Sequence, residues 1–429
     1  MPFLHQNAKN LIHPEFYLTV HREGIFREIT NMRLLHLSFA FLLINMGWGM
    51  AWPYLPNLIK LLGGGVLAVG MLSILFNLAS SFGQFFWGRK SDRMGKRKIF
   101  AVFGVFSSGF FFLLMGFATS VIVVLTLRTL QGFFVSAQTP AVSALVSEIS
   151  RDVGKGFAVF NSFSNVGFML GNFAGGAITS AFPIQYVYYF SALPIFSGMA
   201  ILIFFREERK NPEDLRLLMR YDRPGRTVFR WKNAREFIRR NRNISLFSVS
   251  IFVSMLGSGM VYTFLSLLIG DRFGDAWVGT YFGVDGLVSI PMILLFGYIA
   301  DKYGSKPVLI YGLLGYALTF FLYYSATSIP ILILAAIVSG SKWGSYFNSA
   351  NTYVARMSTK GERATALGLM NSAMAAGWVI GPLFGTYLIP EMGLAETVLV
   401  AILPEIVSLA IVLFLRNDRL FRDGMPVES

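Results

Sequence analysis

Four ionisable side chains interrupt stretches of the sequence that are otherwise apolar. They are Arg128, Asp285, Lys342 and Glu405. A charged group is costly in a hydrocarbon environment, so such a residue usually faces a cavity or a charged partner. An acid and a base placed close together there can exchange a proton, bind a charged ligand or form a static ion pair. These four residues are therefore the first candidates for chemistry.

Asp285 and Lys342 are predicted to lie at a similar depth in neighbouring helices. Asp285 precedes Gly297 by twelve residues, and Lys342 precedes Arg356 by fourteen. At 1.5 Å per residue, each lies about 18–21 Å from the helix end that these residues mark. In one interpretation Asp285 takes up and releases a proton under the influence of Lys342 or of a ligand. In a second they form a static salt bridge, and direct ligand binding is a third.

The other two buried charges suggest different roles. Arg128 either tunes proton release nearby or makes hydrogen bonds between helices. Glu405 falls in the last apolar stretch, and we interpret it as a locally bonded packing residue rather than a proton carrier.

The apolar stretches around these charges are long enough to cross a membrane. Hydrophobic residues make up 54% of the chain and charged residues only 14%, whereas a soluble domain has about 25% charged residues. Twelve stretches approach or exceed the ~20 residues that span a bilayer. They are 35–59, 66–87, 99–118, 121–147, 157–180, 186–205, 244–269, 277–299, 308–326, 329–355, 364–389 and 395–415. The chain is thus predicted to be an all-α polytopic membrane protein.

The basic residues predict how the chain is oriented. Of 37 Lys and Arg residues, 33 fall in the termini and in the loops after even-numbered stretches, while the opposite loops hold Lys60 and Arg272. This asymmetry predicts a protein of the cell membrane with both termini in the cytoplasm. The net charge of +14 is then a topology signal that also attracts anionic membrane lipids. We expect no nucleic-acid partner.

The twelve stretches divide into two groups of six. We predict a cytoplasmic tail over 1–33, a six-helix bundle over 34–206, a basic cytoplasmic linker over 207–243, a second bundle over 244–416 and a tail over 417–429. The linker is predicted to form a short amphipathic helix on the inner membrane surface. The chain has no cysteine, and all four histidines lie in or just after the first tail. We therefore expect no metal site and no cofactor.

Two kinds of repeat indicate an internal duplication. The segment Gly88-Arg-Lys-Ser-Asp92-Arg93-Met-Gly95-Lys96-Arg97 resembles Gly297-Tyr-Ile-Ala-Asp301-Lys302-Tyr-Gly304-Ser-Lys306, 209 residues later. Gly167, Gly171 and Gly175 recur as Gly377, Gly381 and Gly385 at an offset of 210. Glycines at a spacing of four let helices pack closely. They form either a rocking seam between the halves or a tight packing surface alone. Duplicated halves of six helices leave a cavity between them.

On these motifs the chain resembles the major facilitator superfamily of transporters, and within it the drug/proton antiporters. The two segments that begin at Gly88 and Gly297 resemble the family's signature loop, and Arg128-Thr-Leu-Gln131-Gly132 resembles its R-x-x-Q-G motif. The glycine row from Gly167 resembles an antiporter motif, although Asn172 stands where that motif has proline. The resemblance implies two pseudo-symmetric six-helix bundles and alternating access.

The resemblance also implies a conformational latch. In the family, the signature loops hold the two halves together in the outward-open state. We expect this role for Gly88, Asp92, Arg93, Gly95, Arg97, Gly297, Asp301 and Gly304.

The family pattern further implies a substrate cavity lined mainly by helices 1, 4, 7 and 10. The candidates by position are Asn45, Trp48, Trp52, Gln131, Gln138, Asn165, Tyr262, Trp343, Tyr346, Asn348 and Trp378. Aromatic side chains with few fixed polar groups suit amphipathic or hydrophobic ligands, and cationic ligands could sit on their faces.

The sequence therefore favours a secondary active transporter, with proton-coupled efflux of amphipathic or hydrophobic compounds as the leading hypothesis. One alternative is uptake or facilitated diffusion of a polar metabolite such as a sugar, for which Asn45, Gln131 and Asn165 would have to converge. Another is a non-transporting sensor or lipid-handling protein. The apolar stretches lack the converging His, Asp, Glu or Cys residues that an enzyme needs, so we predict no enzymatic activity, and we expect a monomer.

Overall fold

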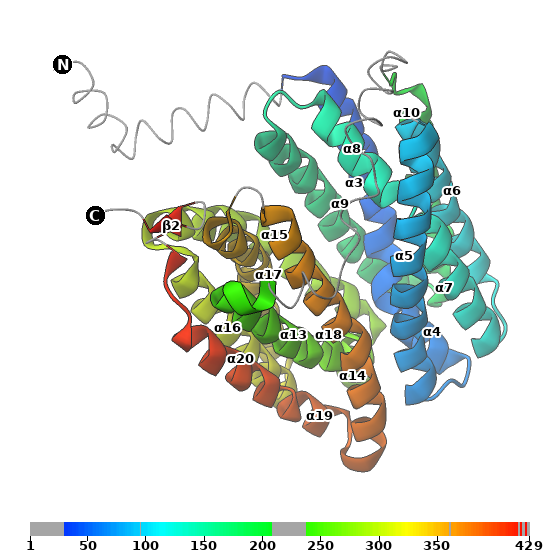
Figure 1. Cartoon of the computed structure of the whole chain (residues 1–429). Coiled ribbons are helices and arrows are strands. Elements are labelled where there is room, and N and C mark those ends of the chain that lie inside the picture. The colour runs from blue at the N-terminus through cyan, green and yellow to red at the C-terminus, as the bar shows by residue number, and fades with distance from the viewer. Residues whose placement is uncertain are drawn as a thin grey trace.

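The protein consists of two bundles of membrane-crossing helices (Figure 1). The computed structural model describes residues 30–94, 96–207, 237–359, 362–418, 421–422 and 425–426. Within these ranges twelve helices, several of them broken, form two groups of six. The tail over 1–29 and most of the linker, residues 208–236, lie outside the described residues, and the predicted amphipathic helix falls largely there.

The N-terminal bundle contains the first six membrane-crossing helices. They are α3 (Met32–Ala51) continued by η1 (Trp52–Tyr54) and α4 (Leu55–Leu61), α5 (Val66–Met94), α6 (Arg97–Gly116), α7 (Val121–Val135) continued by α8 (Gln138–Ile149), α9 (Val153–Ala181) and α10 (Gln185–Phe204). Three of them begin at a side chain that accepts a backbone hydrogen bond, a common helix start. These caps are Asn31, Ser120 and Asp152.

The C-terminal bundle contains the other six. They are α13 (Arg242–Tyr262) continued by α14 (Leu265–Phe273), α15 (Asp275–Tyr303), α16 (Ser305–Ser325), α17 (Ile329–Met357), α18 (Arg363–Met392), and α19 (Leu394–Val400) continued by α20 (Ile402–Phe414). Two short strands, β1 (Phe421–Arg422) and β2 (Met425–Pro426), form an antiparallel pair after them. Gly274, Gly304 and Gly393 connect successive helices with φ values of 89°, 91° and 96°, which few other residues adopt.

The length and apolarity of these helices suit a lipid environment. Eleven of the described helices, counting broken ones once, meet both requirements for crossing a membrane. The remaining one, α9, has 29 residues but carries glycine, serine and asparagine along its length. It packs against α3 of its own bundle and α15 of the other, so it needs less lipid-facing apolar surface. The predicted twelve-helix fold therefore agrees with the structure.

The helices that carry the signature loops run further than the sequence suggested. The two segments that resemble the signature loop begin at Gly88 and Gly297, but both glycines lie inside helices, α5 and α15. A side chain added at Gly297 would meet no atom within 4 Å, so the backbone does not require glycine there. In the second loop the helix continues until Gly304, where the positive φ ends it.

The internal duplication is visible in the packing of the two bundles. Gly167 and Gly171 of α9 lie against the backbone carbonyls of Leu42 and Met46 of α3, so that an added Cβ would come within 2.0 Å of each oxygen. Gly377, Gly381 and Gly385 of α18 pack in the same way on Phe252, Leu256 and Met260 of α13. Each contact in the second bundle lies 210 residues after its counterpart. All six glycines, with Gly175 on Met50, therefore pack helices together within a bundle.

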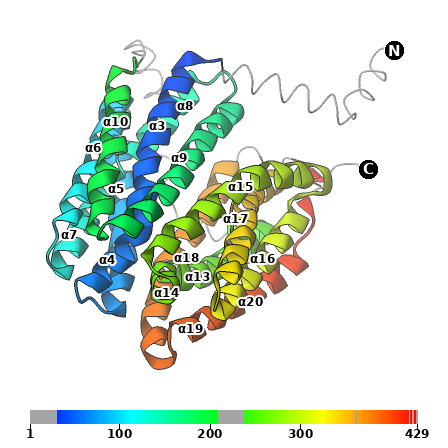
Figure 2. The same cartoon turned by 180° about the vertical axis from the view of Figure 1, so that it is seen from behind.

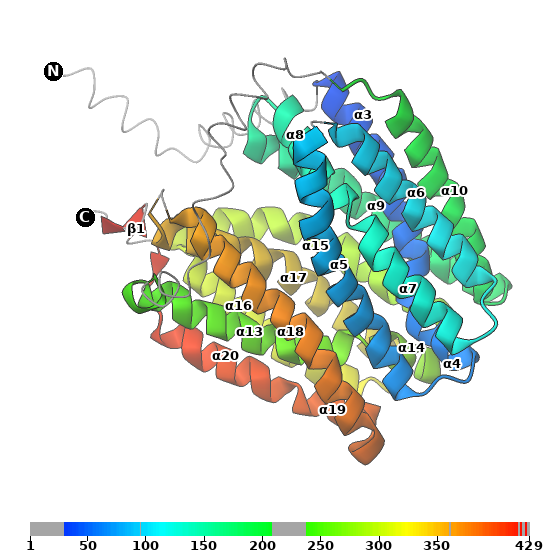
Figure 3. The ribbon, with the colours of Figure 1, turned by 45° about the vertical axis from the view of Figure 1, so that its right-hand side comes forward.

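The two bundles meet at one end and diverge at the other (Figures 1 and 2). We call the end that carries the turns at 62–65, 274 and 393 the closed end, and the end from which both termini leave the basic end. At the closed end α9 packs on α15, where an added Cβ at Gly279 would lie 2.3 Å from the carbonyl oxygen of Asn172. There α5 also packs on α18 (Figure 3), through Gly70 and Thr386.

A candidate substrate site between the two bundles

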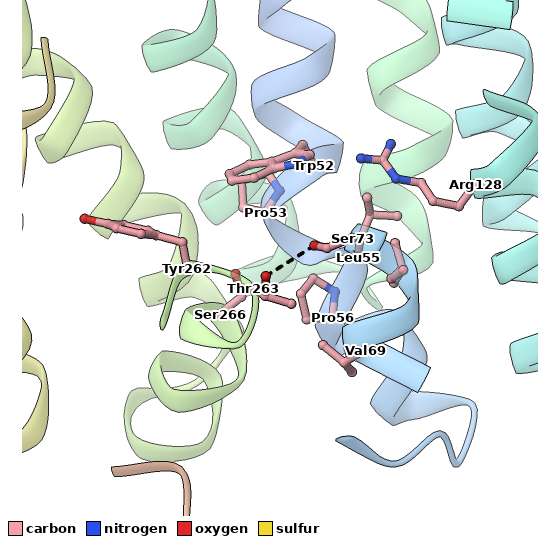
Figure 4. A pocket seen from close by; sticks show the side chains of 11 residues that line it. Trp52, Pro53, Leu55, Pro56, Val69, Ser73, Arg128, Tyr262, Thr263 and Ser266 are labelled. Atoms are coloured by element: carbon pink, nitrogen blue, oxygen red, sulfur yellow. Dashed lines mark hydrogen bonds between the residues drawn. The ribbon is translucent and has the colours of Figure 1, made fainter. Parts of the chain in front are cut away.

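A small pocket lies between the bundles near the closed end (Figure 4). Its walls combine aromatic and proline side chains with four hydroxyl groups, one of them that of a tyrosine, and one arginine. The lining residues are Trp52, Pro53, Leu55, Pro56, Val69, Leu72, Ser73, Arg128, Tyr262, Thr263 and Ser266. This mixture of apolar surface and few polar groups is typical of small-molecule sites.

The breaks in the first and seventh membrane-crossing helices build this pocket. α3 ends at Ala51, where Trp52 and Pro53 start a short 3-10 turn, and α13 ends at Tyr262, before Thr263. Trp52 and Tyr262 are again 210 residues apart. In Figure 4 the Trp52 ring lies in the space between the bundles, whereas the Tyr262 ring extends away from Trp52 and Arg128 into its own bundle, where its hydroxyl meets Lys342. The Thr263 hydroxyl also donates to Ser73 of the other bundle, at 3.4 Å.

Arg128 contributes a buried positive charge to the pocket. It is 3% exposed, and its guanidinium carbon lies 3.7 Å from the ring centre of Phe76 and 5.7 Å from that of Trp48. Nη1 donates a hydrogen bond to Gln131, which in turn donates to the carbonyl oxygen of Ser108. Because Gln131 is fully buried beneath Arg128, it orients the arginine and does not line the cavity as we had expected.

Lys342 approaches the pocket from the other bundle through Tyr262. Its Nζ donates to the Tyr262 hydroxyl at 2.6 Å and lies 3.7 Å from the ring centre of Tyr316. The Tyr262 hydroxyl is also 3.1 Å from that of Ser339. Asp285 interacts electrostatically with Ser339 and with Lys342. No ion pair within 4.0 Å joins Asp285 to Lys342 in the described chain, so the static salt bridge, one of the alternatives, is not formed in this conformation.

Glu405 occupies a separate polar cluster behind Lys342. It is 1% exposed and accepts a hydrogen bond from Ser254 at 2.7 Å, as a locally bonded packing residue would. Tyr346 belongs to this region, since it is 1% exposed and its ring lies 5.8 Å from that of Tyr316. Tyr346 is therefore buried inside its bundle, which differs from its expected place in the cavity wall.

The remaining cavity candidates fall into two groups. The rings of Trp378 and Trp343 extend the aromatic wall from Tyr262, with centroid distances of 6.3 Å and 6.4 Å along the series. None of the polar candidates lines this pocket. Asn45 donates to the Phe41 carbonyl oxygen of its own helix, Gln138 packs against Gly104, and Asn165 and Asn348 are exposed.

Comparison with known proteins identifies the family. The sequence profile of the Major Facilitator Superfamily matches residues 37–283 and 247–424. The chain belongs to the major facilitator superfamily. An uncharacterised MFS-type transporter of Methanocaldococcus jannaschii is 26% identical over 366 residues, which cover 83% of this chain and 89% of that protein. Multidrug resistance protein 2 of Bacillus subtilis is 24% identical over 278 residues, or 62% of this chain and 68% of its own length.

Solved structures agree with this fold. The nucleoside transporter NupG superposes with a TM-score of 0.71 at 13% identity, covering 89% of this chain and 98% of its own. At that identity the likeness is one of fold. This superfamily member is therefore a membrane-embedded, multi-pass transporter. Among its described residues, no cluster of three His, Cys, Asp or Glu side chains could hold a metal.

The signature loops of this transporter make contacts within their own bundles. Asp301 accepts from Arg356 at 3.0 Å, and the exposed Arg93 lies in the last turn of α5. Arg97 Nη1 donates to Ser91 at 3.3 Å. The side chain of Asp92 and residue Gly95 lie outside what the structure describes. The described contacts of Arg97 and Asp301 thus lie within one bundle, and the latch between bundles stays a prediction.

Each bundle has an acidic cap that the sequence did not reveal. Glu207, after α10, accepts from the backbone N–H groups of Arg97 and Lys98 at 2.7 and 3.2 Å. Asp418, after α20, accepts from those of Ser305 and Lys306 at 2.6 and 3.2 Å. Both carboxylates satisfy the first N–H groups of the helix that follows a signature loop.

Sequence reasoning also missed the seal at the closed end. Lys60 of α4 pairs with Asp271 of α14, and Asn57 donates to Asp275, so both bonds join one bundle to the other. One signal was available. Lys60 is one of only two basic residues in the loops of that end, and an isolated base there needs a specific partner.

Proposed function

We propose that this transporter exports small amphipathic compounds across the cell membrane by alternating access, driven by protons moving the opposite way. The observation that carries the proposal is the position of Tyr262. Its side chain lines the pocket between the bundles, and its hydroxyl accepts a hydrogen bond from Lys342. Tyr262 is also within electrostatic range of Asp285. One side chain thereby connects the ligand pocket to the acid and base that would handle the proton.

The orientation follows from the charge asymmetry. If the basic end is cytoplasmic, as the positive-inside rule requires, the closed end faces outward and both termini lie inside the cell. The conformation is then inward-open, with the pocket accessible from the cytoplasm. The latch residues Asp92, Arg97 and Asp301 would engage across the bundles only when the basic ends close.

Proton uptake would be transmitted to the ligand through Lys342. When Asp285 is ionised it offsets the charge of Lys342, and when Asp285 takes up a proton this offset is lost. A buried charge without its partner is strongly unfavourable, so the Lys342–Tyr262 hydrogen bond and the pocket wall would rearrange. Proton binding and ligand binding would then favour different conformations, which is the requirement for coupling.

The choice of efflux rests on two supports. Several relatives, including multidrug resistance protein 2 of Bacillus subtilis, are named for drug resistance, and the pocket has a largely apolar wall. The alternative of polar-metabolite uptake keeps some support from the hydroxyls of Ser73, Thr263 and Ser266. It needs converging amides, however, and Asn45, Gln131 and Asn165 do not line the pocket. In the membrane we propose a monomer in contact with anionic lipids, with protons as its coupling ion.

The decisive test is flux in proteoliposomes under an imposed pH gradient. Three amphipathic dyes, one cationic, one neutral and one anionic, would be compared for wild type, Asp285→Asn and the control Glu391→Gln, an exposed acid at the closed end. We expect gradient-driven accumulation of at least one dye by wild type and control, and none by Asp285→Asn.

Other outcomes would change the proposal. Full gradient dependence in Asp285→Asn would remove Asp285 as the proton carrier. Binding of a dye without flux under any gradient would favour a sensor or lipid-handling protein, and sugar flux in place of dye flux would favour uptake of a polar metabolite.

A further inference from the structure

Arg128 is a buried cation without a counter-ion in its own bundle. Within residues 32–204 the sequence has three acids, Asp92, Glu148 and Asp152, and all lie at the basic end of α5, α8 or α9. The group that interacts electrostatically with Arg128 is the uncharged hydroxyl of Tyr188 in α10. The other described groups packed around it are the rings of Trp48 and Phe76 and the amide of Gln131. A buried charge left unpaired in this way is costly.

One edge of the Arg128 guanidinium carries a hydrogen-bond donor that has no partner among the described residues. Nη1 is bonded to Gln131, whereas Nε is buried and has no hydrogen-bond partner among the described residues. The side chain is 3% exposed and lines the pocket, which it approaches from the side opposite Tyr262 (Figure 4). The edge formed by Nε and Nη2 has the two parallel donors that fit a carboxylate.

Four aromatic rings in and around the pocket already face a cation of the protein. Arg128 covers Phe76 and Trp48, and Lys342 covers Tyr316 at 3.7 Å and Tyr262 at 5.1 Å. A cationic ligand would therefore meet two like charges and few open ring faces. The sequence analysis allowed cationic ligands on these rings. The positions of Arg128 and Lys342 instead disfavour a cationic ligand.

We propose that the pocket binds an aromatic monocarboxylate, with its carboxylate on the Nε–Nη2 edge of Arg128 and its ring against Trp52 and the neighbouring prolines. The inference rests on the proposed function in that it takes the pocket to be the substrate site. The ligand supplies the counter-ion that the N-terminal bundle lacks. The hydroxyls of Ser73, Thr263 and Ser266 line the rest of the wall and can accept or donate hydrogen bonds to a further polar group.

Binding to the purified full-length protein in detergent tests this inference without any transport step. Three probes share one ring and differ in charge: 2-naphthoate, 2-naphthamide and 2-naphthylmethylammonium. We expect wild type to bind the carboxylate about tenfold or more tighter than the amide, as a charge-assisted hydrogen bond would give. The ammonium probe should bind most weakly. Affinity would be followed by quenching of tryptophan fluorescence and by calorimetry.

Substitution of the arginine provides the second measurement. Arg128→Met should reduce naphthoate affinity to that of naphthamide and leave naphthamide affinity unchanged, while Arg128→Lys should retain part of the preference. The ligand-free Arg128→Met protein should melt at an equal or higher temperature than wild type, because an uncompensated charge has been removed. A purely structural arginine would instead lower the melting temperature. Lys342→Met, which removes the buried cation of the other bundle, should keep the preference for the carboxylate.

Several results would overturn the inference. They are equal affinity for the three probes, preference for the ammonium, no binding of any probe by wild type, or loss of the preference in Lys342→Met but not in Arg128→Met. These outcomes are separable from failure of the proposed function. Carboxylate binding without proton-driven flux would contradict only the transport proposal, and flux of cationic dyes alone would contradict only the ligand class.

Discussion

The two bundles share a backbone design but differ in their buried charges. Corresponding glycines, helix breaks and acidic caps recur about 210 residues apart. Only Arg128 is a buried charge in the membrane-crossing part of the first bundle, among its described residues, whereas the second holds the buried Lys342 and Glu405 and the half-buried Asp285. At the position equivalent to Asp285 the first bundle has Phe76, and at that of Glu405 it has Ile195. The duplicated scaffold has therefore kept its packing while its chemistry diverged.

This contrast suggests a division of labour. The first bundle offers a fixed positive charge to the pocket, and the second offers an acid and a base at some distance from each other, joined through Tyr262 and Ser339. A fixed charge suits ligand binding, and an acid–base set with adjustable partners suits proton transfer. The predictions below test first the shared scaffold and then the differences.

The largest loss of stability is expected at the glycines through which helices pack closely in both bundles. An added Cβ at Gly171 would lie 2.0 Å from the Met46 carbonyl oxygen, and one at Gly381 would lie 2.4 Å from that of Leu256. Overpacking of this kind costs about 1–3 kcal/mol. Gly171→Ala and Gly381→Ala should therefore lower the melting temperature by similar amounts.

Gly297→Ala is the matched control, because nothing lies within 4 Å of the added Cβ. Alanine inside a helix gains about 0.5–1 kcal/mol over glycine, so this variant should melt at the same or a higher temperature. A large loss in only one of the two packing variants would show that the bundles do not share this dependence.

The acidic caps should show the next largest effect, and an unequal one. Asp418 is fully buried and also accepts from Arg356, whereas Glu207 is half-buried and contacts two backbone N–H groups. Loss of a helix cap costs about 0.5–2 kcal/mol. We expect the loss of stability to lie near the upper value for Asp418→Asn and near the lower value for Glu207→Gln. Thermal unfolding of both variants would measure it. The opposite order would mean that Arg356 adds nothing at the second cap.

Much of the fold follows from the sequence, because hydrophobic length and repeat spacing report directly on membrane crossing and duplication. The twelve helices and the glycine rows were predicted in this way. The helix ends near Gly88 and Gly297 were not, since a glycine inside a helix and one that ends it look alike in sequence. Positive φ, as at Gly304, depends on the surrounding backbone.

The site was less accessible to sequence reasoning. Residue type and depth indicated Trp52, Tyr262, Arg128 and Lys342, but not which way each side chain faces. Gln131 and Tyr346 are buried inside their own bundles. Successive residues of a helix point about 100° apart, and in a helix that is apolar all round the sequence pattern does not show which of them faces the cavity. The partner of an isolated charge such as Lys60 is also set by tertiary packing.

A smaller effect should follow when the link between pocket and lysine is cut. Tyr262→Phe removes the hydroxyl that accepts from Lys342 and keeps the ring that lines the pocket. Gradient-driven flux should fall about tenfold, as expected for loss of a hydrogen bond to a charged group, with little change in ligand affinity. Tyr316→Phe is the control, since its hydroxyl has no partner among the described residues. Equal loss in both variants would contradict a specific link through Tyr262.

The smallest effects should appear at the closed end, where the bundles hold each other. Asn57→Leu installs the residue that the second bundle carries at the equivalent position, Leu267, and removes the bond to Asp275. Lys60→Met removes the salt bridge to Asp271. The two side chains are 54% and 52% exposed, so this salt bridge contributes less than about 1 kcal/mol to stability. Since the chain has no cysteine, spin labels on Leu61→Cys and Glu396→Cys can report opening of this end.

We expect Asn57→Leu to broaden the distance distribution between these labels more than Lys60→Met does, because Asn57 is 8% exposed and its bond is shielded from water. High salt should mimic Lys60→Met in the wild type, since screening weakens an exposed ion pair, and should have no further effect in that variant. A larger effect of Lys60→Met would mean that the exposed pair, rather than the buried amide, holds the bundles together at this end.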